Sequence, residues 1–136
     1  MNDLWAEDIV IETFRTPVAI LREQASLLGQ KTQNLVLAEV DSSLGSNFQH
    51  RFNITAPALG SYSYRLFTVS HPMDLYPLNV DLDSDICYEL GLFFKPAPVK
   101  RISIEDEAEF LKLLDRILKA ERTKYIIRTL LSQISG

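Results

Sequence analysis

Cysteine and glycine are scarce in this chain of 136 residues, and their scarcity excludes several kinds of site. The single cysteine, Cys87, can form neither an internal disulfide nor a zinc site built from several thiolates. The glycines are isolated from one another, so the glycine-rich loops that hold nucleotide phosphates do not occur. We therefore expect no disulfide framework and no cofactor.

Long apolar runs and an excess of basic residues are also missing. No stretch approaches the ~18 apolar residues of a membrane-spanning helix. The first residues include Asp3, Glu7 and Asp8, where a targeting peptide would be basic. The net charge is −4, whereas nucleic-acid binders usually carry a basic surface. We expect a cytoplasmic protein with no membrane span, and the charge disfavours a nucleic-acid partner.

The composition that remains is typical of a globular domain, with 46% hydrophobic and 24% charged residues. We expect one domain over residues 1–136, large enough for a real core. An arm over residues 1–15 precedes it, in which Trp5 and Phe14 need cover from elsewhere. The prolines of the segment 95–98 predict an extended connector to helices within 103–134.

Caps and alternation predict the secondary structure. Thr16 followed by Pro17 predicts the start of a helix that ends near Gly29. Alternating apolar and polar residues predict strands over 48–55, 62–69 and 76–83, and apolar runs predict two more over 35–40 and 88–94. Ser103 is expected to cap the next helix. Within 62–69, the apolar residues change faces, which indicates either cover on both faces or a β-bulge.

These elements predict an α+β fold. Short connections between strands favour hairpins, hence a mainly antiparallel sheet of four or five strands. The N-terminal helix and two C-terminal helices are expected to pack on one face of that sheet.

The apolar face of the C-terminal region changes sides. Residues 104–118 form one apolar arc, and a second arc follows that a straight helix would place roughly 165° away. Either the helix breaks near 120–123 and folds back as a hairpin, or one long helix projects and needs a partner. The second arc is the predicted interface, joined by strand residues of types common in interfaces. Its members are Ile126, Ile127, Leu130, Leu131, Ile134, Tyr62, Tyr64 and Arg65.

Candidates for chemistry are few. His50 lies on an apolar strand face, and His71 and Asp74 flank a turn, so these three could act as acid and base. His71, Asp81 and Asp83 could bind a metal ion at a strand end. A purely structural interpretation is favoured in each case. His50 is expected to be a hydrogen-bonded histidine, His71 and Asp74 to form a turn, and the aspartates to lie at a solvated strand end.

Three functions remain open. The favoured hypothesis is a non-catalytic protein-interaction or regulatory domain that associates with itself or binds another protein. The second is a small metal-assisted hydrolase or nuclease with its site at the strand ends. The third is binding of a small apolar ligand between the sheet and the helices. The side chains expected to line that site are Phe48, Phe52, Tyr64 and Phe67.

Overall fold

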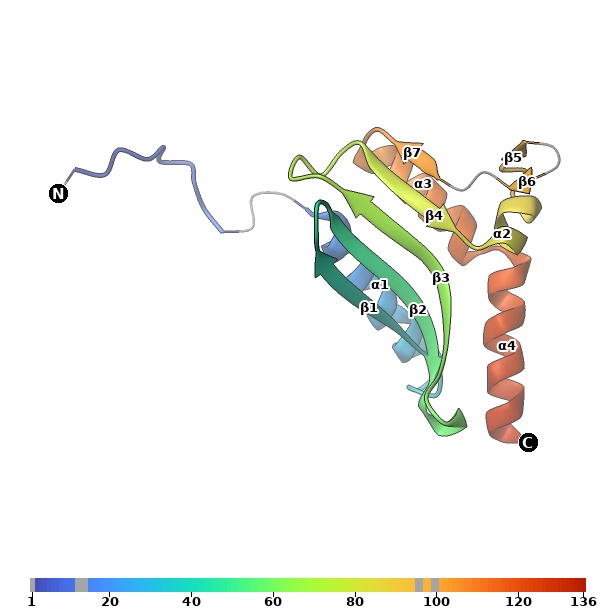
Figure 1. The fold of residues 1–136 in the computed structure, drawn as a ribbon. Helices are drawn as coiled ribbons and strands as arrows, with labels where there is room; N and C mark the ends of the chain where they lie inside the picture. The colour runs from blue at the N-terminus through green and yellow to red at the C-terminus, as the bar shows by residue number, and fades with distance from the viewer. Residues whose placement is uncertain (1, 12–14, 95–96, 99–100) are drawn as a thin grey trace.

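A five-stranded antiparallel sheet forms the centre of the molecule, in the strand order β1-β2-β3-β4-β7 (Figure 1). The computed structural model describes residues 2–11, 15–94, 97–98 and 101–136. The strands of the sheet are β1 (Leu37–Leu44), β2 (Phe48–Ala56), β3 (Tyr62–His71), β4 (Leu78–Leu82) and β7 (Ile102–Ile104). A separate two-stranded pair joins β5 (Phe93–Phe94) to β6 (Ala97–Pro98).

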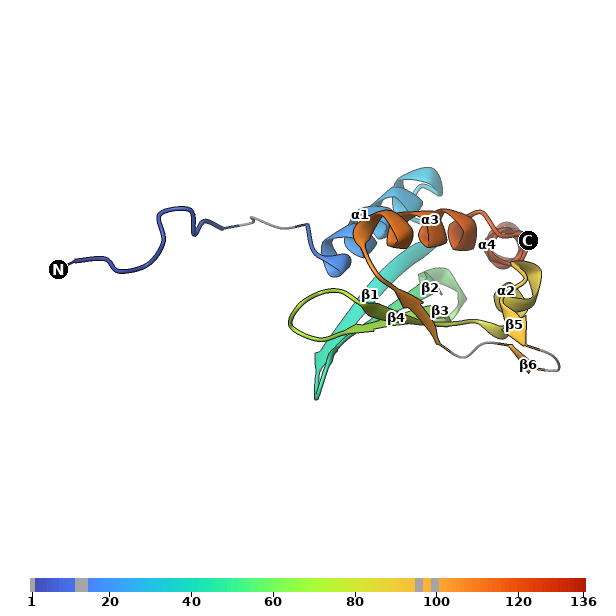
Figure 2. The ribbon, with the colours of Figure 1, turned by 90° about the horizontal axis from the view of Figure 1, so that it is seen from above.

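The larger helices lie on one face of the sheet (Figure 2). The helices are α1 (Pro17–Lys31), α2 (Ser84–Glu89), α3 (Glu107–Leu118), α4 (Glu121–Ser135) and the short 3₁₀ turn η1 (Pro57–Leu59). The predicted α+β fold, with an antiparallel sheet, an N-terminal helix and two C-terminal helices, is confirmed. None of the helices in the described ranges combines the length and the hydropathy needed to cross a bilayer.

Capping side chains set the starts of α1 and α3, as they do for α2. The Thr16 hydroxyl accepts a hydrogen bond from Ala19 N at 3.2 Å, as the sequence predicts. The cap of α3 is Asp106, whose carboxylate accepts from Glu109 N at 2.9 Å. The prediction that Ser103 caps this helix is wrong. Ser103 lies in strand β7, where it pairs with Asn79 of β4.

The strand predicted over 88–94 is also wrong for most of its length. Asp83 accepts a hydrogen bond from Ile86 N and starts helix α2 there. Only residues 93–94 are extended, in β5. Of the predicted connector, Ala97 and Pro98 form β6, and residues 95–96 lie outside the described residues. The apolar residues of this stretch predict a strand, but the capping aspartate favours a helix over the same residues.

A β-bulge explains the change of faces in strand β3. The pairing between β2 and β3 shifts after Phe52, so that Phe67 pairs with Phe52 while Tyr64 pairs with Ile54. The extra residue lets Tyr62, Tyr64 and Phe67 share one face. Of the two predicted explanations, the bulge is the correct one.

The core lies between this face and the helices. Phe52 and Phe67 stack at its centre, with ring centroids 5.0 Å apart, and both are almost fully buried. Phe110 and Ile117 enter the core from α3, and Ile20 enters it from α1. Helix α3 lies between α1 and α4, and the residues of its wide apolar arc are therefore buried (Figure 2).

The C-terminal region breaks into two helices, so the predicted break is confirmed, but the predicted hairpin is wrong, because α4 runs across the direction of α3 and not back along it (Figure 2). Helix α3 ends at Leu118 and α4 begins at Glu121. The Thr123 hydroxyl donates to Ile117 O across the break at 2.7 Å. Helix α4 therefore packs beside the domain, in contact with α2 and η1, and does not project freely.

The arm over residues 2–11 extends away from the domain (Figure 1). Its large apolar side chains are all exposed, by 61–92%. They are Leu4, Trp5, Ile9, Val10 and Ile11. Trp5, which the sequence predicts to be covered by another surface, is 79% exposed. Phe14, the other residue of this prediction, lies outside the described residues.

Candidate functional site

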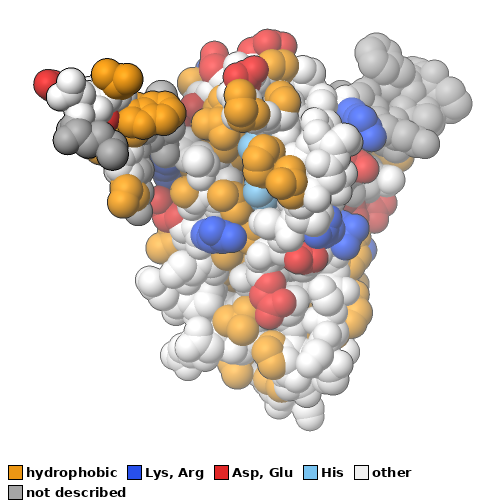
Figure 3. All heavy atoms as spheres, turned by 60° about the vertical axis from the view of Figure 1, so that its left-hand side comes forward, with side chains coloured by type: hydrophobic (Ala, Val, Ile, Leu, Met, Phe, Trp, Pro, Cys, Tyr) orange, Lys and Arg blue, Asp and Glu red, His pale blue; other side chains and the backbone are white. Residues whose placement is uncertain are grey.

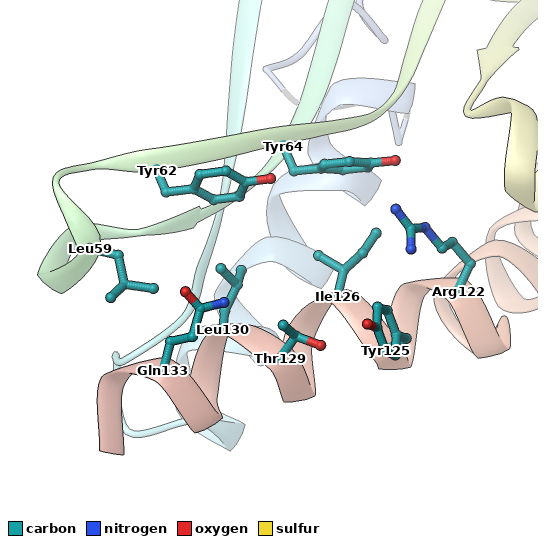
Figure 4. Close-up of a pocket in the computed structure, with 9 residues that line it drawn as sticks. All are labelled: Leu59, Tyr62, Tyr64, Arg122, Tyr125, Ile126, Thr129, Leu130 and Gln133. Atoms are coloured by element: carbon teal, nitrogen blue, oxygen red, sulfur yellow. The ribbon is translucent and has the colours of Figure 1, made fainter. Parts of the chain in front are cut away.

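A groove between helix α4 and strand β3 gathers half of the predicted interface residues (Figure 4). It has a volume of about 340 Å³. Tyr62 and Tyr64 form one wall, and Ile126 and Leu130 face them from α4. These four side chains come from segments that lie far apart in the chain, and they meet because the bulge in β3 turns both tyrosines toward the helix.

Arg122 joins the two walls of this α4–β3 groove. Its guanidinium carbon lies 5.7 Å from the centre of the Tyr64 ring and 5.6 Å from that of Tyr125. Such contacts are cation–π interactions. Asp85 also contacts the guanidinium, at 3.5 Å from Nε. Tyrosine and arginine side chains around an apolar floor are typical of protein-binding hot spots.

Tyr64 is held in place by a hydrogen bond from its hydroxyl to Asp83. Burial, and then this bond, raise the pKa of Tyr64 above its usual value. The phenol is consequently neutral at physiological pH. Asp83, one of the predicted metal ligands, caps α2 and accepts the hydrogen bond of this tyrosine.

The start of α4 depends on Glu89, a residue of helix α2. Its two carboxylate oxygens accept hydrogen bonds from Glu121 N at 2.6 Å and from Arg122 N at 2.9 Å. The cap residue itself, Ala120, has no side chain that can accept a hydrogen bond from these N–H groups. A carboxylate at this position also interacts favourably with the helix dipole.

We expect Glu89→Gln to lower the free energy of unfolding by about 1 kcal/mol, the usual scale of a lost helix cap. The amide keeps one acceptor oxygen and loses the charge. Urea denaturation measures the change, with Glu39→Gln, on the exposed side of β1, as the matched control. Equal stability of the two variants would show that Glu89 does not hold α4.

The rest of the predicted interface is divided. Ile126 and Leu130 are nearly buried and form the groove floor. Ile127 lines a different groove, described next. Leu131 and Ile134 are half-buried against the core, and Arg65 is exposed on β3 outside the groove lining. Most of the second apolar arc therefore packs against the domain. Only its half-buried residues keep surface that a partner could contact.

A second groove, of about 430 Å³, opens between helices α1 and α3. Its floor is Phe52, Ile54 and Leu114, all buried, and its rim includes the exposed side chains of Leu27 and Leu111. This α1–α3 groove lies where the sequence predicts an apolar site between sheet and helices. Of the four side chains predicted to line that site, Phe52 lines it. Phe48, Tyr64 and Phe67 are outside its lining.

The rim of the α1–α3 groove carries three charged residues. Lys31 comes from α1, and Lys119 and Asp115 come from the end of α3. Asp115 pairs with Lys119 at 2.6 Å. Lys31 forms no ion pair within the described ranges, so the rim keeps an excess of positive charge.

The two histidines meet across β2 and β3. His50 Nε2 and His71 Nε2 are 3.1 Å apart, and both side chains are buried. His71 Nδ1 lies 2.7 Å from Pro72 O, to which it must donate because a carbonyl only accepts. In neutral rings, His50 Nε2 then donates to His71, and Ser42 donates to His50 Nδ1 at 2.7 Å.

This chain of hydrogen bonds satisfies both rings in the neutral state. Burial, and then the neighbouring His71, lower the pKa of His50 to about 4. The Phe48 ring stacks on His71 with centroids 5.3 Å apart. Figure 3 shows histidine atoms, in pale blue, at the surface between hydrophobic side chains.

The other polar candidates lie apart from this pair. Asp74 is exposed in the turn after His71, and Asp81 is exposed on β4. Within the described part of the chain, no three His, Cys, Asp or Glu side chains are grouped to hold a metal ion. Cys87 is buried in the core, which raises the pKa of its thiol. The predicted metal-assisted site stays a prediction.

Sequence reasoning missed Arg122, Tyr125 and Ser42. Arg122 and Tyr125 occupy the turn that follows the helix break, so their position depends on where α4 starts. Ser42 lies opposite His50 in the pairing of β1 with β2, which the chain alone does not reveal. The alternation around His50 did indicate that this histidine faces the core and needs a partner.

The chain was compared with protein-family models, curated proteins and solved structures. No protein-family model, no curated protein and no solved structure matches this chain. The function must therefore be argued from the surfaces described above.

Proposed function

We propose that this chain is a non-catalytic protein-interaction domain that associates with a second copy of itself. The observation that carries the proposal is the arm over residues 2–11. Five large apolar side chains of the arm lie in water, by 61–92% of their surface. Large exposed apolar areas are uncommon on soluble monomers and often mark a binding site.

The contacts of the arm support this interpretation. Among the described residues, its hydrogen bonds are local, from Trp5 N to Asp3 and from Ile9 N to Ala6 O. The arm points away from its own domain (Figure 1), so another molecule is the natural source of cover. Two grooves on the domain offer apolar surface to receive it.

Sedimentation velocity of the full chain tests the proposal. We expect a dimer that dissociates on dilution. Replacing Ile9, Val10 and Ile11 together with serine should raise the dissociation constant at least about tenfold, because the arm loses three of its five large apolar side chains. The control replaces Leu44 and Met73, two exposed apolar residues outside the arm, with serine. A wild-type chain that remains monomeric at every concentration contradicts the proposal.

A second candidate is binding of a small apolar ligand in the α1–α3 groove. The observation in its favour is the size of the groove, about 430 Å³ with a floor of buried apolar side chains. Pockets of about 300–1,000 Å³ suit small molecules. A thermal-shift screen with fatty acids and other lipid-like compounds tests it. Stabilisation that is lost in Leu111→Glu supports the ligand, and no stabilisation by any compound argues against it.

A further inference from the structure

The arm and the α1–α3 groove match each other in chemistry. The arm over residues 2–11 carries three carboxylates, from Asp3, Glu7 and Asp8, and no basic residue. The groove has an apolar floor, and its rim keeps the positive charge of Lys31. An acidic apolar segment can bury its side chains there and place its carboxylates near a lysine.

The α4–β3 groove fits this arm less well. Its one guanidinium, on Arg122, is already in contact with Asp85 and with two tyrosine rings. Glu89 lies at the same end of the groove and caps α4. An acidic arm would meet carboxylates at this end, so electrostatics favour the α1–α3 groove.

Length and area are sufficient for exchange between two copies. Ten extended residues span up to ~33 Å, whereas the groove follows α1 from Gln24 to Lys31, roughly 10 Å along the helix axis. The groove takes roughly three extended residues, so the rest of the docked arm lies on the surface beside it. Five large side chains at roughly 100–200 Å² each, contributed by both arms of a symmetric pair, then give at most roughly 1,000–2,000 Å². Stable interfaces bury a similar area, roughly 1,200–2,000 Å².

We propose that the arm of one copy docks in the α1–α3 groove of a second copy, with both copies exchanging arms symmetrically. Each copy then supplies one segment and one groove, as closed two-fold dimers require. This inference rests on the proposed self-association and specifies the surface that performs it. The α1–α3 groove is then the site of the arm, and an apolar ligand would compete for it.

Trp5 reports on this docking directly, because it is the only tryptophan of the chain. A tryptophan in water emits at longer wavelength than one in an apolar groove. We expect the emission of the full chain to move to longer wavelength on dilution from roughly 100 µM to 0.1 µM, as a micromolar dimer dissociates. The same transition should appear in sedimentation velocity.

Groove variants locate the docking site. Leu27→Glu and Leu111→Glu change rim residues that are already exposed, so the fold should persist, which far-UV circular dichroism checks. Each should raise the dissociation constant at least about tenfold and give long-wavelength emission at every concentration, because a carboxylate enters an apolar contact with an acidic arm. Leu44→Glu, at an exposed apolar position on the β1–β2 hairpin and outside the groove, is the control and should change neither quantity.

Several results would overturn the inference, and they are distinguishable. Short-wavelength emission that is independent of concentration places the arm in the groove of its own copy. Sensitivity to Tyr62→Ala and Tyr125→Ala in place of the Leu27 and Leu111 variants places it in the α4–β3 groove. A dimer with exposed Trp5 overturns the docking and leaves the self-association standing. A monomer with exposed Trp5 throughout overturns both.

Discussion

Leu130→Ala is expected to lower the free energy of unfolding by about 2–5 kcal/mol, the range measured for buried leucines. Leu130 is 5% exposed and packs into the main core from α4. Its loss leaves a cavity under the helix in addition to the lost transfer free energy. Thermal or urea denaturation followed by circular dichroism measures the effect.

Leu131→Ala is the matched control for that experiment. Leu131 has the same side chain on the same helix but is only half-buried. We expect a loss of about 1 kcal/mol, in proportion to the smaller apolar area removed from water. Small and equal effects at the two positions would show that α4 leaves the domain, and the second apolar arc would then be the free interface.

Acidification is expected to destabilise the fold through His50. The pKa of His50 is about 4 in the folded state against 6.5 for an ordinary histidine. The unfolded chain therefore binds more protons between these values, so stability falls as the pH falls from 6.5 to 4. At pH 4 the loss from this residue amounts to about 3 kcal/mol relative to pH 7.

His50→Gln isolates this contribution from that of the carboxylates. Glutamine is neutral at every pH and keeps both a donor and an acceptor for Ser42 and His71. Urea denaturation at pH 7 and pH 4 gives the two free energies for each chain. The wild type should lose about 3 kcal/mol more than the variant does. Equal losses in both chains would mean that His50 takes up a proton in the folded state as readily as in the unfolded chain.

Much of the fold could be predicted because local signals and tertiary structure agree. Thr16 and Pro17 start α1 in the sequence and in the structure. The alternation around Phe52 correctly predicts β2 as a half-buried strand. Predictions failed where one polar side chain decides between two local structures. Asp83 starts a helix in an apolar stretch, and Asp106, in place of Ser103, caps α3.

The candidate site was harder to predict, because it depends on contacts between distant segments. The α4–β3 groove exists only because the bulge reorients Tyr62 and Tyr64 and because Glu89 fixes the start of α4. The hydrogen bond of His50 to His71 depends on the register of β2 with β3. Local patterning could indicate that Trp5 needs cover. It could not indicate which surface supplies that cover.

Native mass spectrometry of the unaltered chain tests the central claim most directly. Self-association through the arm predicts a dimer of twice the chain mass, with the dimer fraction falling on dilution and no other molecule required. A chain that is monomeric at all concentrations would contradict the claim. A monomer that retains a lipid-sized mass would also contradict it and would assign the α1–α3 groove to a small apolar ligand.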